Sequence, residues 1–376
     1  MRRLRIVFES ILYRNPHPGH QAVCAYLPNV VPISERELLC FYRLGQAFYS
    51  LDGRLAVLRS RDGGETWVEE GDLWDPQQET APHSYSAPHG TLLRDGTLLL
   101  VAHRFRATQD QLFRFNPETG GLKPFELVLF RSSDLGRTWA PPQAIQVGGG
   151  GVADAPSNVI ELSDGSLFLA LERWKSWDDT SPLHIRGSAL FSRDGGSTWG
   201  EEIDFPSACD PSRMFSHSRY SRMLDGRVCA LQWTQSIGGQ ENFPLHFVRS
   251  DTAGTRWETP RPTTIPAQTS WAADLGEGVL AAAYSIRERM KPGVLVTLSE
   301  DGGRSWDLDH QVMVWDAVGQ EFLGVDHKPE YPASHDNIAF GKPNLVRLPG
   351  GDLLASWWCT QACITHIRCA RLTVEE

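Results

Sequence analysis

Hydrophobic runs of strand length, each interrupted by a short polar turn, recur along the chain. Four of them occupy residues 91–103, 159–172, 220–233 and 344–358. Their centres carry Gly96, Gly165, Gly226 and the pair Gly350–Gly351, mostly preceded by Asp. Asp-Gly between extended runs is typical of a hairpin, because glycine accepts the positive φ of a tight reversal. The pattern therefore predicts antiparallel hairpins throughout the chain.

A second repeat, Ser-x-Asp-x-Gly-x-x-Trp, runs out of phase with the hairpins. Intact copies occupy residues 60–67, 132–139, 192–199 and 299–306, and a degenerate copy at 250–257 has Thr252 in the aspartate position. Each unit fits two longer strands, a third that ends at the motif and a fourth that begins at its tryptophan. Four antiparallel strands repeated in this way are typical of a β-propeller blade.

The motif resembles the Asp-box, or bacterial neuraminidase repeat, of the sialidase superfamily. The resemblance extends from about Gln21 to the C-terminus and implies an all-β, six-bladed propeller. We expect blades at about 20–74, 83–147, 153–207, 215–264, 268–316 and 335–373. The last segment has no box, and the N-terminal run 2–10 is expected to supply its fourth strand and close the ring.

Composition is that of a single soluble globular domain spanning residues 1–376. The chain is 41% hydrophobic, and its 24 prolines and 34 glycines are spread among turns without forming a linker, so no domain boundary is visible. The formal net charge is −10, with Lys and Arg scattered, which argues against a nucleic-acid partner. An anionic ligand would need a local cluster of arginines.

We expect no membrane partner and a cytoplasmic location. No apolar segment approaches the length of a transmembrane helix, and Glu9 and Arg14 interrupt the hydrophobic run at the N-terminus, which makes a poor signal peptide. Seven cysteines, an odd number, suit a reducing compartment. The oligomeric state is left open.

No cofactor and no metal are expected. The acidic residues lack the spacing of a calcium loop, and the histidines are scattered over several blades. One group offers atoms that zinc accepts: Cys359, Cys363, His366 and Cys369. However, this stretch is predicted to be a hairpin, in which alternate side chains face opposite sides.

Topology separates a structural face from a functional one. In a blade with strands A to D, the A–B and C–D turns lie on one face, and the B–C loops and the inter-blade connections lie on the other. The Asp-Gly turns and the boxes therefore share one face, where we interpret the boxes as turn staples without a catalytic part. Ligand chemistry is expected on the opposite face.

Polar and aromatic side chains from every blade are predicted to converge on that face. The candidates for substrate binding are His83, His89, His103, Arg104, Arg173, Trp174, His217, Arg219, Trp233, Arg287 and Lys342. Further polar positions there are Gln235, Trp271, Glu288, Arg289, His335, Asp336 and Asn344. Arg104, Arg173, Arg219 and Arg287 come from four blades at comparable heights, an arrangement able to hold a carboxylate by bidentate hydrogen bonds.

The resemblance also implies catalytic roles. In the sialidase family three arginines hold the sugar carboxylate, a Tyr paired with a Glu is the nucleophile, and an Asp is the general acid/base, which is an exception to the two-carboxylate rule for glycosidases. Here Tyr220 with Glu172 would be the nucleophilic pair and Asp154 the acid/base. The family's early Phe-Arg-Ile-Pro segment corresponds to residues 85–88, where Ser86 takes the arginine position.

Three functions remain open at this point. The first is a sialidase-like, exo-acting glycoside hydrolase that removes a terminal, acidic sugar from a glycan. The second is a lyase on uronate-containing glycans, in which His83, His89, His103 or Tyr220 would remove a proton while an arginine neutralises the carboxylate. The third is a carbohydrate- or protein-binding propeller without turnover, since a fold does not fix a function.

Overall fold

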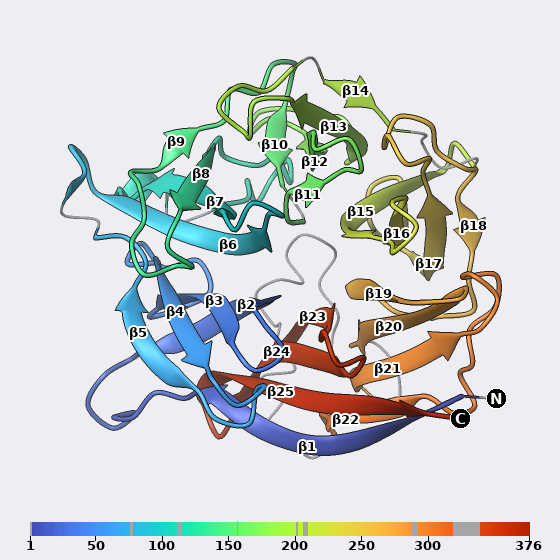
Figure 1. The fold of residues 1–376 in the computed structure, drawn as a ribbon. Coiled ribbons are helices and arrows are strands. Elements are labelled where there is room, and N and C mark those ends of the chain that lie inside the picture. Colours follow the sequence, from blue (N-terminus) through green and yellow to red (C-terminus); the bar gives the residue numbers. More distant parts are fainter. Residues whose placement is uncertain are drawn as a thin grey trace.

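Six antiparallel sheets surround a common axis in the computed structural model (Figure 1). It describes residues 2–75, 78–111, 114–155, 157–200, 202–205, 210–287, 292–318 and 339–376. These residues contain no α-helix, and none of their helical turns is long and apolar enough to cross a membrane. The protein is a six-bladed β-propeller, as the repeats predicted.

The strands follow the expected blade boundaries closely. Blade 1 comprises β2 (Cys24–Pro32), β3 (Leu38–Gly45), β4 (Arg54–Ser60) and β5 (Val68–Asp72). Blade 2 comprises β6 (His83–Leu92), β7 (Leu98–Arg106), β8 (Glu126–Ser132) and β9 (Gln143–Ala144). Blade 3 comprises β10 (Val152–Asp154), β11 (Ile160–Glu161), β12 (Leu167–Trp174), β13 (Arg186–Ser192) and β14 (Ile203–Asp204).

The remaining blades complete the ring. Blade 4 comprises β15 (Arg213–Arg222), β16 (Val228–Ser236), β17 (Asn242–Arg249) and β18 (Arg261–Pro262). Blade 5 comprises β19 (Ser270–Gly276), β20 (Val279–Ile286), β21 (Gly293–Ser299) and β22 (Val312–Asp316). Blade 6 comprises β23 (Phe340–Arg347), β24 (Leu353–Gln361), β25 (Ile364–Glu375) and, on its outer side, β1 (Arg3–Tyr13). The predicted closure by the N-terminal strand is thus confirmed.

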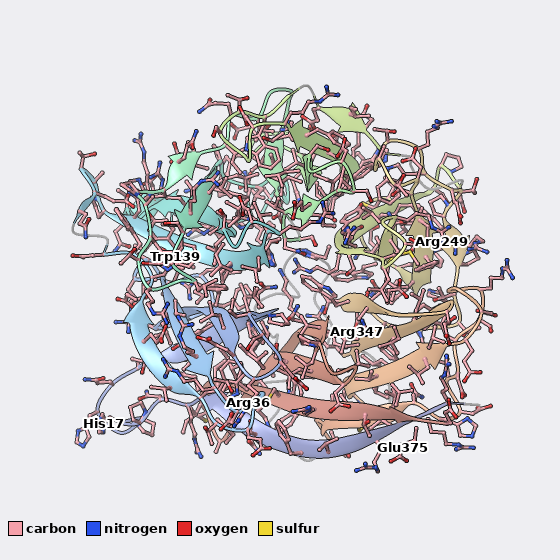
Figure 2. All side chains as sticks on the ribbon, viewed as in Figure 1. His17, Arg36, Trp139, Arg249, Arg347 and Glu375 are labelled. Carbon is pink, nitrogen blue, oxygen red and sulfur yellow. The ribbon has the colours of Figure 1, made fainter. Side chains whose placement is uncertain are left out.

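Neighbouring blades share hydrophobic cores. Between blades 1 and 2, for example, Phe41 and Leu39 pack with Leu98 and Phe130, all fully buried. Trp139, the last residue of a box, lies edge-on to Phe41 with ring centroids 5.6 Å apart (Figure 2). Because the apolar side chains of each sheet face the next blade, burial of apolar surface holds the ring together.

Each Asp-box closes a tight turn with its own side chains. In the first copy the Ser60 hydroxyl donates to Asp62 Oδ1 at 2.8 Å and accepts from the Gly64 N–H at 2.9 Å. The Thr66 N–H donates to Asp62 Oδ1 at 3.0 Å, and Trp67 Nε1 donates to the Gly64 carbonyl at 3.0 Å. The donors are satisfied locally, as the interpretation of the boxes as turn staples requires.

The degenerate copy keeps its turn by a substitution within the motif. Thr252 occupies the usual aspartate position, but Asp251 accepts hydrogen bonds from the N–H groups of Thr255 at 3.0 Å and Arg256 at 3.3 Å. Trp257 Nε1 still donates to the Gly254 carbonyl at 3.1 Å. The carboxylate thus stands one residue earlier than in the intact boxes, and the turn still forms its hydrogen bonds.

The innermost strands of four blades carry a bulge at equivalent places. The pairing register shifts in β2, β6, β15 and β23. Within each bulge a residue other than glycine takes a left-handed conformation: Leu27, Ala87, His217 and Lys342, with φ of 56°, 50°, 45° and 44°. Such conformations cost about 1–3 kcal/mol each and concentrate at functional sites. Here they aim side chains at the propeller axis.

Polar residues near the axis connect three pairs of adjacent blades. Asn344 of blade 6 accepts from the Val30 N–H of blade 1 at 2.9 Å, and Asn29 of blade 1 accepts from the Gly90 N–H of blade 2 at 2.8 Å. In the same way the Ser157 hydroxyl of blade 3 accepts from the Tyr220 N–H of blade 4 at 3.0 Å. These three bonds hold the axial ends of the blades in register, and so fix the floor of the site.

Candidate functional site

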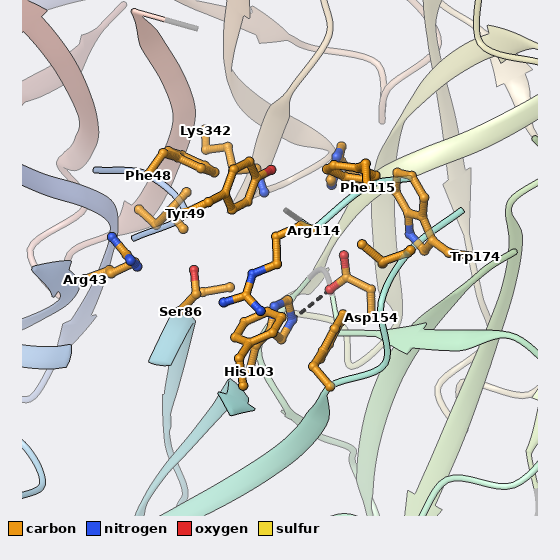
Figure 3. A pocket seen from close by; sticks show the side chains of 16 residues that line it. Arg43, Phe48, Tyr49, Ser86, His103, Arg114, Phe115, Asp154, Trp174 and Lys342 are labelled. Atoms are coloured by element: carbon orange, nitrogen blue, oxygen red, sulfur yellow. Dashed lines mark ion pairs between the residues drawn. The ribbon is translucent and has the colours of Figure 1, made fainter. Parts of the chain in front are cut away.

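The candidate site is a pocket at the axis, on the face opposite the Asp-boxes. Its floor includes the four bulge residues Leu27, Ala87, His217 and Lys342. Its walls come from the loop after β3 and the loop after β7, which contribute Tyr49, Arg114 and Phe115, and from Trp174 at the end of β12 (Figure 3). The cavity measures about 70 Å³, room for a few water molecules. A sugar ring would enter only with movement of these side chains.

Two carboxyl groups lie side by side at the axial edge of blade 3. Asp154 on β10 is the direct cross-strand partner of Glu172 on β12. Asp154 lines the pocket, and Glu172 is buried with an exposed fraction of 2%. Carboxyl oxygens of the two residues approach within 4.8 Å, together with a ring nitrogen of His217. Two of the three residues predicted to be catalytic, Asp154 and Glu172, are therefore adjacent.

Their surroundings push the two pKa values apart. Burial, reinforced by the negative charge of Asp154, raises the pKa of Glu172 to about 8, although the N–H groups of Ser218 and His217 oppose the change. Burial acts in the same direction on Asp154, but His103, Lys342 and Arg219 outweigh it and lower the pKa of this carboxyl below its ordinary value. At neutral pH the pair therefore holds one proton, on Glu172.

Histidines on blade 2 orient the charged groups. His103 Nε2 lies 2.8 Å from Asp154 Oδ1, the ion pair drawn in Figure 3. His89 Nε2 lies 3.0 Å from Arg219 Nη1. Burial and the charge of Arg219 lower the pKa of His89 well below its ordinary value, so the neutral imidazole accepts this hydrogen bond. Both histidines point to the axis from the innermost strands of their blade.

Cations complete the axial cluster. Burial lowers the pKa of Arg219 to about 10, and burial with the nearby Arg219 lowers the pKa of Lys342 to about 8. The Arg287 guanidinium lies 5.7 Å from the centre of the Trp233 ring, in a smaller hollow that Lys342 and His217 share with the main pocket. A divalent metal at Asp154, Glu172 and His217 would face these positive charges, so a proton on Glu172 fits the group better than a metal.

The predicted convergence of four arginines is wrong for two of them. The Arg104 guanidinium lies 2.8 Å from Glu126 and 3.8 Å from Glu79, which also pairs with His83. Arg173 is paired with Glu202 at the periphery of blade 3. The cause is strand alternation: Arg104 and Arg173 adjoin His103 and Glu172 in sequence, so they point away from the axis.

The aromatic candidates divide in the same way. Trp174 lines the pocket 5.9 Å from Phe115, and the Trp233 ring stacks on His217 at 5.7 Å. The Tyr220 ring instead lies in the core between blades 3 and 4, 5.9 Å from Phe168 and 5.4 Å from Phe205. Like Glu172, Tyr220 lines neither axial hollow, and burial, reinforced by the negative charge of Glu172, raises the pKa of its hydroxyl above its ordinary value.

Some predicted positions lie elsewhere or outside the description. Glu288, Arg289, His335 and Asp336 are not among the described residues. The cysteine-rich hairpin forms as expected, with Cys359 opposite His366. The Cys359 Sγ atom lies 3.7 Å from His366 Nε2, but Cys363 is exposed at the turn and the Cys369 Sγ atom lies 3.3 Å from the Ser10 hydroxyl. The four side chains do not converge.

A search of family profiles assigns the chain. The profile of the BNR repeat-like domain matches residues 102–337, more than half of the sequence. The chain belongs to the BNR repeat-like domain family. A search of curated proteins finds no match.

Solved structures share the fold of this BNR repeat-like protein at low identity. A protein of unknown function from Dyadobacter fermentans is 18% identical, with 99% of each chain covered and a TM-score of 0.73. A Hadza microbial sialidase is 16% identical over 97% of this chain and 68% of its own, with a TM-score of 0.68. An α-L-arabinanase from Penicillium chrysogenum is 14% identical over 98% of each chain, with a TM-score of 0.63. The sialidase-like propeller fold is thereby confirmed.

One signal of this BNR repeat-like site was readable in the sequence but went unused. Leu27-Pro28-Asn29, Ala87-Pro88-His89 and Lys342-Pro343-Asn344 repeat a bulge residue, a proline and a polar residue. In this repeat the side chains of Asn29 and Asn344 each accept a hydrogen bond from a backbone N–H of the next blade. His89 contacts Arg219 instead. The histidine that replaces asparagine at this position of the repeat therefore belongs to the axial cluster.

Proposed function

We propose that this protein is an exo-acting glycoside hydrolase that removes a terminal, acidic sugar. The observation that carries the proposal is the pair of neighbouring carboxyl groups at the axis, Asp154 and Glu172, whose surroundings lower the pKa of the first and raise the pKa of the second. Glycoside hydrolysis needs a proton for the leaving oxygen and a second carboxylate for the anomeric carbon. Carboxyl groups whose surroundings separate their pKa values supply both roles.

The roles follow from burial and charge. Glu172 holds the proton at neutral pH, and its buried Oε2 atom has no hydrogen-bond partner among the described residues. It lies behind the residues that line the pocket, and we assign it as the donor to the glycosidic oxygen because it is the protonated neighbour of Asp154. Asp154, ionised and exposed to the pocket, attacks or stabilises the anomeric carbon, with His103 holding its orientation. This assignment reverses the division that the sialidase resemblance implied, and it needs no Tyr220 nucleophile.

The separation of the carboxyl groups bears on stereochemistry. An oxygen of each lies within 4.8 Å of the other, which leaves less room for a water molecule than the roughly 6.5–9.5 Å found in inverting enzymes. Retention at the anomeric carbon is therefore expected.

The pocket supports an acidic, terminal sugar. Among the described residues, Arg43, Arg114 and Lys342 line it, against the single carboxylate of Asp154. Loops from blades 1 and 2 wall it with Tyr49 and Phe115, whose rings lie 6.2 Å apart. Sialidases and an arabinanase among the similar structures act on carbohydrates by their names, which favours a sugar as the ligand.

The test is release of 4-methylumbelliferone from the α-sialoside, the β-glucuronide and the α-arabinofuranoside. Wild-type protein should cleave an acidic member, and Asp154→Asn should abolish cleavage. Asp164→Asn, the same change in an exposed turn on the Asp-box face, is the matched control and should cleave normally. Equal rates for wild type and Asp154→Asn would refute the proposal, and an unsaturated product from a uronate polymer would favour a lyase instead.

A further inference from the structure

Arg114 stands out among the residues that line the pocket. Its side chain is buried, with an exposed fraction of 4%, and in Figure 3 its guanidinium lies between Ser86 and Asp154. The Nε and Nη1 atoms are inaccessible to solvent and have no hydrogen-bond partner in the described part of the chain. A buried guanidinium normally has its donors paired, because an unpaired buried charge is costly.

The neighbours of Arg114 do not neutralise it. The guanidinium carbon lies 3.3 Å from the centre of the Phe105 ring, which offers only a cation–π contact. Burial, and then the positive charge of Arg43, lower the pKa of Arg114 to about 9, and among the described residues Tyr49 alone acts in the opposite direction. No carboxylate is among these influences.

Arg43 shows by contrast what a structural arginine looks like in this pocket. Its Nε atom donates to the Tyr85 carbonyl at 3.1 Å, Nη1 to the Ala47 carbonyl at 2.6 Å and Nη2 to the Ser50 carbonyl at 2.8 Å. Its donors are thus committed to backbone carbonyls of the β3–β4 loop and of β6. Arg43 adds positive charge to the pocket. Arg114 adds positive charge and also two N–H donors, Nε and Nη1, that have no partner among the described residues.

The backbone around Arg114 is held firmly in place. The Lys123 N–H donates to the Arg114 carbonyl at 3.0 Å, and Phe115 pairs with Leu122 across a short hairpin. The Leu122 N–H donates to the Lys175 carbonyl at 3.1 Å, which attaches the hairpin to blade 3. The position of Arg114 over the pocket is therefore built into the fold.

The tip of the same hairpin is fitted closely to blade 3. Asn116 Nδ2 and the Thr119 hydroxyl both donate to the Trp177 carbonyl, at 3.0 Å and 2.6 Å. A Cβ atom on Gly121 would lie 2.1 Å from the Ser176 carbonyl oxygen, so only glycine allows this approach. Such close contacts between the hairpin tip and blade 3 are more typical of a functional loop than of a solvent-exposed connection.

We propose that Arg114 is the anion-binding residue of the pocket and that it selects sugars carrying a carboxylate. The substrate carboxylate supplies the partner that the Nε and Nη1 donors lack, in the bidentate geometry that a guanidinium offers. The acid thus binds on the blade 2 side of the pocket, across from the Arg219 and Arg287 cations. The claim that the substrate is an acidic sugar rests on the proposed hydrolase function. The claim that Arg114 binds an anion does not depend on it.

The first experiment measures melting temperature without and with N-acetylneuraminate or D-glucuronate, each beside its neutral methyl ester. The acids should stabilise the wild type and the esters should not. Arg114→Met should melt above the wild type without ligand, because an uncompensated buried charge is removed. It should bind the acids about 10- to 100-fold more weakly, as expected for loss of charge-assisted hydrogen bonds, whereas Arg114→Lys should keep part of the affinity.

Arg173→Met is the matched control, because Arg173 is similarly buried but paired with Glu202. It should melt below the wild type and keep the response to acids. The proposal is overturned if Arg114→Met melts as low as Arg173→Met, if it responds to the acids like the wild type, or if the acids do not stabilise the wild type at any soluble concentration.

Measurements of turnover distinguish failure of the Arg114 proposal from failure of the proposed hydrolase activity. If no glycoside is cleaved but acid binding depends on Arg114, the anion site stands and the hydrolase fails. If wild type and Arg114→Met cleave an acidic glycoside with the same KM, the hydrolase stands and the role of Arg114 is refuted. A raised KM with little change in kcat supports both.

Discussion

Replacing Glu172 with Gln isolates the energetic effect of burying a carboxyl group beside Asp154. The folded protein raises the pKa of Glu172 from 4.5 to about 8. At about 1.4 kcal/mol per pKa unit, this corresponds to a loss of up to roughly 5 kcal/mol of stability when the group ionises. The folded state binds the proton more tightly than the unfolded state, so the contribution of Glu172 to stability is fully present below pH 4.5 and is lost as pH rises to about 8.

The amide that Glu172→Gln introduces stays neutral and can still accept from the Ser218 N–H, which lies 2.8 Å from Oε1 of the glutamate. The variant should therefore lose this part of the pH dependence, and above pH 8 it should be the more stable protein. Urea titrations of both proteins across the pH range measure the difference. Glu241→Gln, a change at an exposed glutamate, controls for loss of charge alone. A wild-type pH slope in Glu172→Gln would refute the reasoning.

Two further variants test the contacts between blades and the tyrosine nucleophile that the sialidase resemblance implied. Asn344→Ala removes the acceptor of the Val30 N–H and leaves that buried donor unpaired, so the free energy of unfolding should fall by about 1–3 kcal/mol; an unchanged urea midpoint would contradict the contribution of this hydrogen bond. Tyr220→Phe should keep kcat on any cleaved glycoside, since the hydroxyl lies in the core between blades 3 and 4; a loss of more than about a hundredfold would restore the tyrosine nucleophile.

The sequence predicts the blades well because their determinants are local. The hydrogen bonds of the first box, for example, lie within the eight residues from Ser60 to Trp67. The hairpin turns and hydrophobic runs recur with the same local chemistry. Five blades are therefore marked by a box of adjacent residues, whereas the sixth has no box and is recognised by its hairpin at residues 344–358 and completed by the N-terminal strand β1.

The site was predicted less completely, for two physical reasons. Arg104 and Arg173 were grouped with their sequence neighbours His103 and Glu172, although alternation along a strand sends adjacent side chains to opposite faces. The same alternation predicts that these two arginines face away from the axis. The contact between His89 and Arg219 joins residues 130 positions apart, so local patterns predicted both residues for this face but could not show that they pair. Arg114 lies on a hairpin outside the repeat, so no repeated pattern marks it.

The most direct test of the central claim is the pH dependence of kcat/KM for the wild type on the glycoside that it cleaves. This quantity reports the ionisation of the free protein. It should be constant near neutral pH and fall above about pH 8 as Glu172 loses its proton, with the acid limb below the ordinary pKa of 3.8 for an aspartate. A rate that stays level or rises through pH 8 would show that Glu172 is not the proton donor, and would contradict the proposed carboxyl pair.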